Sequence, residues 1–204
     1  MIIAYASRTG TRRNLAALRS CGWRLLVSAA GCLRHEGFRF ALDNGAWSAY
    51  TQGRPFNVQA FSVALRKLGS RADWTVLPDI VAGGIPSLEL SLSWMRAVLD
   101  ESPTALLAVQ DGMEPSDVRG FLGQRVGLFV GGSTAWKLRT LDAWGALGRD
   151  VGCWVHVGRV NSARRISNCV VAGAHSFDGT SASRFSVQTP RLDSARRQLG
   201  LGIR

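Results

Sequence analysis

Lysine is almost missing from this basic chain of 204 residues. Arginine supplies all but two of its 25 basic residues, the exceptions being Lys67 and Lys137. Only 14 residues are acidic, so the formal net charge is +11. No Pro-rich or Ser-rich tract interrupts the sequence, and 46% of its residues are hydrophobic. This composition excludes a disordered chain and the length suits one domain, so we expect a single folded domain over residues 1–204.

Long hydrophobic runs are missing as well. Apolar runs such as residues 105–109 and 151–155 are far shorter than the roughly 20 residues that cross a bilayer. The first residues carry no basic segment ahead of their apolar stretch, which a secretory signal would have. We therefore expect a cytoplasmic protein without a membrane partner.

Cysteines at metal-binding spacings are also absent. Ten or more residues separate each neighbouring pair among Cys21, Cys32, Cys153 and Cys169, and no histidine accompanies them at ligand spacing. Structural zinc sites need closely spaced Cys and His ligands, so no metal site is predicted. A free cysteine packs as a small hydrophobe, and we interpret these four as reduced thiols of the core.

The positive charge is concentrated at both ends of the chain. Residues 1–39 hold seven arginines against Glu36, a net charge of 7 − 1 = +6. Residues 159–204 hold eight against Asp178 and Asp193, which gives 8 − 2 = +6. Because the arginine fork suits phosphate groups, two such ends that meet in space would form a face for a polyanion. A genomic preference for arginine codons is the alternative interpretation.

Short β-like runs alternate with helical segments along the chain. The runs cover residues 2–6, 24–28, 38–43, 74–79, 105–110, 127–131, 153–157 and 174–178. Helical periodicity covers residues 12–21, 57–69, 87–100, 115–124, 134–149, 162–172 and 191–199, with Asn57, Ser87 and Ser116 or Ser133 as candidate N-caps. Strands that are apolar on both faces and alternate with helices indicate a parallel sheet covered by helices. Eight units predict a compact α/β fold, a (β/α)8 TIM-like barrel with short loops, and an open doubly wound sheet is the alternative.

Polar residues follow most of the later β-like runs. Asp43 and Asp79 each come after two or more apolar residues, and Asp178 comes after Phe177. The other polar or glycine residues at such positions are Gln110, Asp111, Gly131, Gly132, His156 and Arg159. In a barrel all carboxyl ends of strands meet at one face, where active sites form. Paired carboxylates there can serve as nucleophile and general acid/base at a sugar C1 position, and the two glycines before Ser133 suit either a phosphate or a flat ring.

Four segments resemble those of tRNA-guanine transglycosylases. Residues 43–47 (Asp-Asn-Gly-Ala-Trp) are similar to the Asp-Ser-Gly-Gly-Phe of that family, and residues 109–112 to its Val-Gln-Gly-Gly. Residues 128–132 resemble its Leu-Ala-Val-Gly-Glu, and residues 176–178 the Phe-Asp that holds its nucleophile. The segments keep their order over residues 38–184, and Asp79 stands at the expected place of a fifth.

The resemblance implies a base exchange at a nucleoside, without a cofactor. Asp178 would attack C1′ of a guanosine to give a covalent glycosyl-enzyme, and Asp43 would be the general acid/base. The residues implied to bind the purine are Asp79, Gln110, Gly131 and Gly132, and we add Trp47 and His156 as candidate substrate contacts. The incoming base of the family is a free 7-deazaguanine, such as the 7-cyano form.

The zinc site of the family, a Cys-x-Cys-x-x-Cys run with a distant His, is absent from this sequence. The chain is therefore most similar to the short relatives in phages and bacteria that insert 7-deazaguanines into DNA, which predicts DNA as partner and the host cytoplasm as location if a phage encodes it. A target base must be flipped out or single-stranded. Arg8, Arg159 and Arg184 are candidate DNA contacts, and Trp47 and Trp136 are either exposed aromatics or packing residues. A barrel enzyme acting on a phosphorylated sugar and a non-catalytic DNA-binding module remain alternatives.

Overall fold

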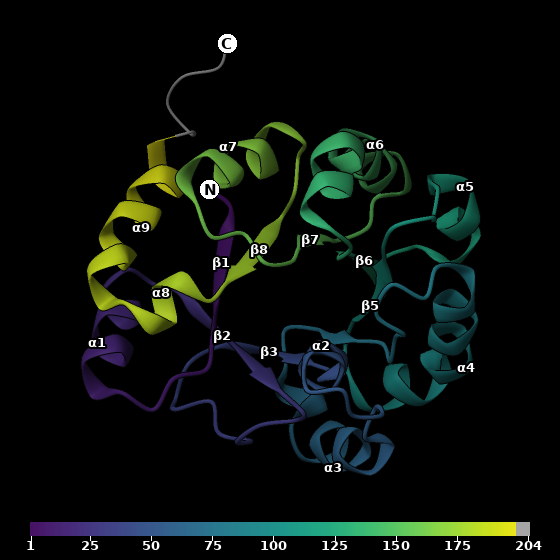
Figure 1. Cartoon of the computed structure of the whole chain (residues 1–204), viewed down its shortest axis with the longest axis horizontal. Coiled ribbons are helices and arrows are strands. Elements are labelled where there is room, and N and C mark those ends of the chain that lie inside the picture. Colours follow the sequence, from purple (N-terminus) through teal and green to yellow (C-terminus); the bar gives the residue numbers. More distant parts are fainter. Residues whose placement is uncertain (199–204) are drawn as a thin grey trace.

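A closed barrel of eight parallel strands forms the centre of the computed structural model, which describes residues 1–198. The strands follow one another in chain order around the barrel, and β1 pairs with β8 to close it (Figure 1). The strands are β1 (Ile3–Ser7), β2 (Arg24–Ser28), β3 (Phe40–Asp43), β4 (Thr75–Val76), β5 (Ala105–Val109), β6 (Val126–Val130), β7 (Val155–Val157) and β8 (Ser176–Gly179). The predicted (β/α)8 barrel is confirmed, and the open sheet is wrong.

Helices surround the strands, as Figure 1 shows. The helices of the described residues are α1 (Arg12–Ser20), α2 (Ala46–Thr51), α3 (Val58–Leu68), α4 (Ile85–Glu101), α5 (Pro115–Val118), α6 (Thr134–Val151), α7 (Ala163–Val171), α8 (Ser181–Arg184) and α9 (Thr189–Gln198). The helix expected over residues 191–199 is α9, and residue 199 lies outside the described part. Within residues 1–198, no helix combines the length and the hydrophobicity that spanning a bilayer requires.

Alternate residues of each strand face either the barrel interior or the helices. On β5, Leu106 and Ala108 belong to the interior cluster, whereas Leu107 belongs to the larger core beneath the helices. Both faces are therefore apolar, as a parallel sheet covered by helices requires. The same period of two places Asp43 on the interior side with Ala41 and directs Asp178 to the side of Ser176.

The connection between β2 and β3 contains no helix, which keeps the barrel small. Residues 29–39 form a loop that two arginines fasten. The Arg19 guanidinium donates a hydrogen bond to the Glu36 carbonyl (2.6 Å) and lies 4.6 Å from the centre of the Phe38 ring. Arg8 forms an ion pair with the Glu36 carboxylate, at 2.6 Å.

Two of the predicted N-caps are confirmed. Asn57 and Ser133 each accept a hydrogen bond from a backbone N–H in the first turn of their helix. The prediction for Ser87 is wrong because α4 begins two residues earlier, at Ile85. Ser116 lies inside α5, so Ser133 is the correct member of that pair.

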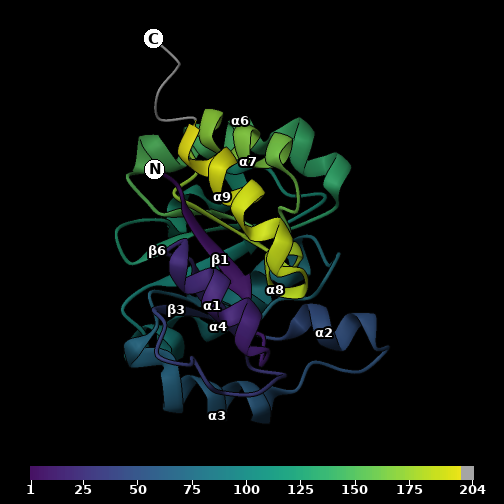
Figure 2. The same ribbon diagram turned by 90° about the vertical axis from the view of Figure 1, so that its left-hand side faces the viewer.

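Helix α2 is not predicted by the sequence pattern. It has six residues, and Gly45 precedes it with a φ of +87°. A Cβ at Gly45 would come within 2.9 Å of the Ala30 Cβ, so glycine is needed both for its backbone angle and for the space. Figure 2 shows α2 projecting from the barrel on the same side as α8.

The cysteines of the described chain are all free thiols. Cys153 and Cys169 are buried, as predicted for core thiols. The interpretation is wrong for Cys32, which is exposed in the β2–β3 loop, and only partly right for the half-buried Cys21.

Candidate active site

Three carboxylates lie together at the carboxyl end of the barrel. Asp43 ends β3, Asp79 follows β4, and Asp178 lies near the end of β8. The charges of Asp178 and Asp79 both help to raise the Asp43 pKa, so the three groups interact electrostatically. The three carboxylates that the sequence singled out therefore form one cluster, at the end where barrel enzymes carry their active sites.

Asp178 is buried and oriented through one oxygen. Its Oδ1 accepts a hydrogen bond from the backbone N–H of Arg159 (3.2 Å) and is 3.1 Å from Nε2 of His156. No hydrogen bond from residues 1–198 reaches its Oδ2. One carboxylate oxygen is thus fixed, and the other keeps its lone pairs for a ligand.

A chain of hydrogen bonds determines the tautomer of His156. The Trp154 indole N–H can only donate, and it donates to the Ser176 hydroxyl (3.0 Å). The Ser176 hydroxyl in turn lies 2.8 Å from Nδ1 of His156 and has its proton left for it. Because a carboxylate can only accept, Nε2 carries the ring proton and donates it to Asp178, and Nδ1 accepts from the Ser176 hydroxyl. Because burial lowers the pKa of His156, the ring is neutral at pH 7.

Asp43 has a raised pKa. Burial, with contributions from the charges of Asp178 and Asp79, raises its pKa to about 6. Hydrogen bonds from Ser28 and from the Gly45 N–H (3.1 Å) oppose this rise. A carboxyl group with such a pKa exchanges its proton near neutral pH, as a general acid/base must.

Asn44 positions Asp79, a role that the sequence analysis missed. The Asn44 amide donates to the Asp79 carboxylate (2.7 Å) and to the Leu77 carbonyl (2.6 Å). Burial raises the pKa of Asp79, and the bond from Asn44 opposes that rise. Asp79 Oδ2 accepts no hydrogen bond from residues 1–198, so it can accept one from a ligand.

Gln110 lies at the predicted strand end, but its amide is engaged in holding the loop after β4. Its Nε2 donates to the Ile80 carbonyl (2.8 Å) and to the Ser87 hydroxyl (2.7 Å). Its Oε1 accepts from the Ala82 N–H (2.6 Å), and Ala82 has a φ of +57°. Gln110 therefore shapes the backbone that follows Asp79 rather than offering free polar atoms.

The Gly131–Gly132 turn is closed by Asp111. The Asp111 carboxylate accepts hydrogen bonds from the Ser133 N–H (2.6 Å) and the Ser133 hydroxyl (2.7 Å) at the start of α6. Burial alone would raise the Asp111 pKa, but these bonds lower it. The Gly131 N–H donates to a backbone carbonyl. A carboxylate thus occupies the position that a phosphate would take at this helix N-terminus.

Arg159 connects several parts of the site. Its guanidinium lies 4.0 Å from the centre of the Trp47 ring, a cation–π contact, and donates to the Gly132 carbonyl. Its backbone has a φ of +58°, which directs the N–H to Asp178. Trp47 is 43% exposed, so one face of this assembly is open to solvent.

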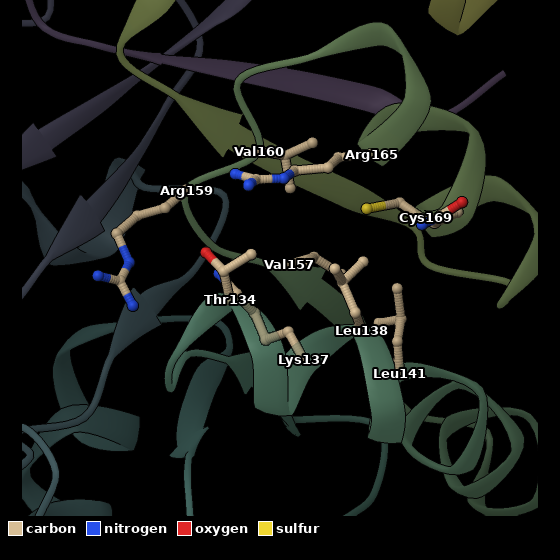
Figure 3. Close-up of a pocket in the computed structure, with 10 residues that line it drawn as sticks. Thr134, Lys137, Leu138, Leu141, Val157, Arg159, Val160, Arg165 and Cys169 are labelled. Atoms are coloured by element: carbon tan, nitrogen blue, oxygen red, sulfur yellow. The ribbon is translucent and has the colours of Figure 1, made fainter.

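Lys137 is a second supporting residue that the sequence analysis missed. Its buried ammonium group donates to the Gly158 carbonyl, directly before Arg159. Burial, aided by the charge of Arg159, lowers the Lys137 pKa to about 8. The pocket beside it between α6 and α7 measures about 20 Å³, room for one water molecule (Figure 3). In Figure 3 the Arg159 side chain is directed away from Cys169.

The other predicted nucleic-acid contacts, Arg8 and Arg184, differ in solvent exposure. Arg184 is exposed on α8, but Arg8 is half-buried in its ion pair with Glu36. Trp136 is 6% exposed and packs against Trp144, so its exposed interpretation is wrong and the packing interpretation is right.

Within residues 1–198, no cluster of three or more His, Cys, Asp or Glu side chains is arranged to hold a metal ion. No protein-family model matches the chain, and a search of curated proteins gives no match. The chemistry of the site is therefore the basis for assigning a function.

Proposed function

We propose that this chain is a DNA-guanine transglycosylase, which exchanges guanine in DNA for a free 7-deazaguanine base. One observation carries the proposal: an aspartate with one oriented and one open oxygen, Asp178, interacts with a second aspartate, Asp43, whose pKa of about 6 suits proton transfer. The order and strand positions of the transglycosylase-like segments support the same chemistry.

In the first half-reaction, Oδ2 of Asp178 attacks C1′ of the target nucleoside. The bond from C1′ to N9 of guanine breaks, its electron pair leaves with the base, and Asp43 gives the base a proton. The products are neutral guanine, a glycosyl ester on Asp178 and the Asp43 carboxylate.

In the second half-reaction, Asp43 takes the N9 proton of the incoming 7-deazaguanine. N9 then bonds to C1′, and the ester oxygen leaves as the Asp178 carboxylate. Each half-reaction returns what the other consumed, so no cofactor is required. The open oxygen of Asp79 would accept from N–H groups of the purine edge, with Asn44 holding it in place.

DNA as substrate is supported by the arginine-rich ends of the chain and by the absence of the zinc-binding run from its sequence. A phosphorylated sugar is disfavoured, because the Asp111 carboxylate already occupies the N-terminus of α6.

The decisive experiment incubates the protein with a 7-deazaguanine and DNA or tRNA that carries labelled guanine. We expect release of labelled guanine from DNA, and nucleoside mass spectrometry of that DNA should detect the inserted base. Asp178→Ala should abolish exchange, whereas Asp142→Asn, an exposed carboxylate on α6, should leave it unchanged. Exchange that persists in Asp178→Ala would refute the nucleophile, and unchanged nucleosides with both polymers would favour a non-catalytic binding module.

A further inference from the structure

A cavity lies at the end of the barrel opposite to Asp178. It measures about 440 Å³ and is lined by Tyr5, Arg24, Arg39, Asp73, Trp74, Thr104, Gln124, Gly152, Cys153, Trp154 and His175. All eight strands contribute lining residues. For β2 to β8 these residues stand at the start of the strand or within three residues before it, and for β1 the lining residue is Tyr5, in the middle of the strand. The cavity is therefore an opening on the barrel axis at the amino ends of the strands. Its size falls within the ~300–1,000 Å³ of small-molecule sites.

The charged groups of this cavity carry a positive surplus. Both oxygens of Asp73 are engaged: Oδ2 accepts from the Tyr5 hydroxyl (2.9 Å) and from Arg24 (2.9 Å), and Oδ1 accepts from Arg39 (2.7 Å). Two guanidinium groups thus face one carboxylate. His175 adds no charge at pH 7, since burial lowers its pKa.

Arg24 keeps hydrogen-bond donors for a ligand. Arg24 uses only Nη1 in bonds to Asp73 and Tyr5. The indole N–H of Trp74 is buried and has no hydrogen-bond partner within residues 1–198, although Trp74 lines the cavity.

The accessible aromatic surface of the cavity is the Trp154–His175 pair, whose rings stack at 4.9 Å. The Tyr5 and Trp74 rings are enclosed, at 0% and 1% exposure, and meet edge to face at 5.1 Å. An aromatic pair of this kind can contact a flat ring, while the arginines suit a phosphate or a carboxylate.

We propose that this amino-end cavity binds a small aromatic anion, a flat ring that carries a phosphate or carboxylate group, as a site separate from the carboxylate cluster. The anion would contact Arg24 and Arg39, and the ring would lie against the Trp154–His175 pair. The site does not depend on the proposed transglycosylase activity, and its test needs no turnover.

Calorimetric titration of the full chain tests the proposal with four probes: thymidine monophosphate, thymidine, inorganic phosphate and 4-hydroxybenzoate. We expect saturable binding of an aromatic anion, and at least about tenfold weaker binding of thymidine and of inorganic phosphate, which each lack one half of the ligand. Arg24→Gln should weaken that binding about tenfold or more. Arg66→Gln, a matched change at an exposed position of α3, should have no effect.

NMR of the tryptophan side chains gives a second readout that needs no arginine variant. The Trp74 indole signal, identified as the one missing in Trp74→Phe, should shift when the probe saturates the protein. Binding of an aromatic anion that depends on Arg24 or that moves the Trp74 signal supports the proposal. If thymidine monophosphate binds more tightly than 4-hydroxybenzoate, the charged group is a phosphate, and if it binds less tightly, the group is a carboxylate. Binding of neither anion, or binding that Arg24→Gln leaves intact and that does not move the Trp74 signal, would overturn it.

Discussion

Asp43 and Asp178 are both aspartates at strand ends, but their partners suit them to different tasks. Asp178 receives two hydrogen bonds on Oδ1, from the His156 ring and the Arg159 backbone, which orient the carboxylate and leave Oδ2 open. Burial, together with the charges of Asp178 and Asp79, raises the pKa of Asp43 to about 6. On the proposed mechanism, environment rather than residue type separates the nucleophile from the acid/base.

The raised Asp43 pKa predicts how stability changes with pH. The folded state holds this proton up to about pH 6, whereas an unfolded aspartate releases it near pH 3.9. The folded state therefore binds more protons between these values, and the stability contributed by protonated Asp43 is lost as the pH rises through them. Asp43→Asn should be more stable than the wild type at pH 8, by about 2–3 kcal/mol, and the gain should vanish below pH 4. Urea unfolding at several pH values measures this, and a constant difference would contradict the raised pKa.

Ser176 tests the hydrogen-bond chain that ends on Asp178. Ser176→Ala removes the proton that His156 Nδ1 accepts, so the ring is no longer restricted to the tautomer that donates to Asp178. We expect about tenfold or more loss in kcat of base exchange with KM for DNA unchanged, because no DNA contact is removed. The matched control is Ser93→Ala on α4, where the hydroxyl is exposed. Equal loss in kcat and rise in KM would show that the serine has only a structural role.

At the scale of elements, the turn between β3 and α2 determines where Asp43 and Trp47 point. Gly45→Ala should destabilise the protein by about 2–4 kcal/mol, since it adds a Cβ at positive φ and places it 2.9 Å from Ala30. Gly53 also has positive φ (+61°) but has open space around it, so Gly53→Ala measures the backbone cost alone, about 1 kcal/mol. Thermal unfolding of both variants separates the two terms, and equal losses would show that the contact with Ala30 relaxes.

The strand pattern predicted the barrel because eight largely apolar runs alternate with helical segments. The polar residues that follow several of these runs predicted Asp43, Asp79 and Asp178. Asn44 and Ser176 were missed although each stands within two residues of a predicted aspartate, a spacing that could have identified them. The engagement of Gln110 and the burial of Lys137 depend on contacts between distant segments, which no local pattern contains. Helix α2 is too short for periodicity to reveal it.

At the scale of the whole molecule, pairing of β1 with β8 brings the two arginine-rich ends together. The Asn14 amide donates to the Ser183 carbonyl (2.6 Å), so the first turn of α1, with the exposed Arg12 and Arg13, lies beside α8 and Arg184. Figure 2 shows α1, α8 and α9 on one side of the barrel. These arginines belong to the end of the barrel that carries the carboxylate cluster.

This arrangement predicts a strong dependence of DNA binding on salt. Each phosphate contact contributes about 0.9 to the slope of log K against log salt concentration, so Arg184→Gln should reduce the magnitude of that slope by about one and weaken binding to all sequences alike. Fluorescence anisotropy at several salt concentrations measures the slope, with Arg66→Gln as the control. An unchanged slope in Arg184→Gln would remove α8 from the DNA interface.

Because β1 pairs with β8, a newly synthesised chain can complete the candidate active site only after β8 has been made. Tyr5 and Asp178 are register partners on adjacent strands although 178 − 5 = 173 positions separate them. Contacts this distant form late, because the intervening chain must first be ordered. A chain emerging from the ribosome carries Asp43 and Asp79 long before it can carry an oriented Asp178. On the proposed mechanism, a chain that ends before β8 lacks the nucleophile and cannot form the glycosyl ester.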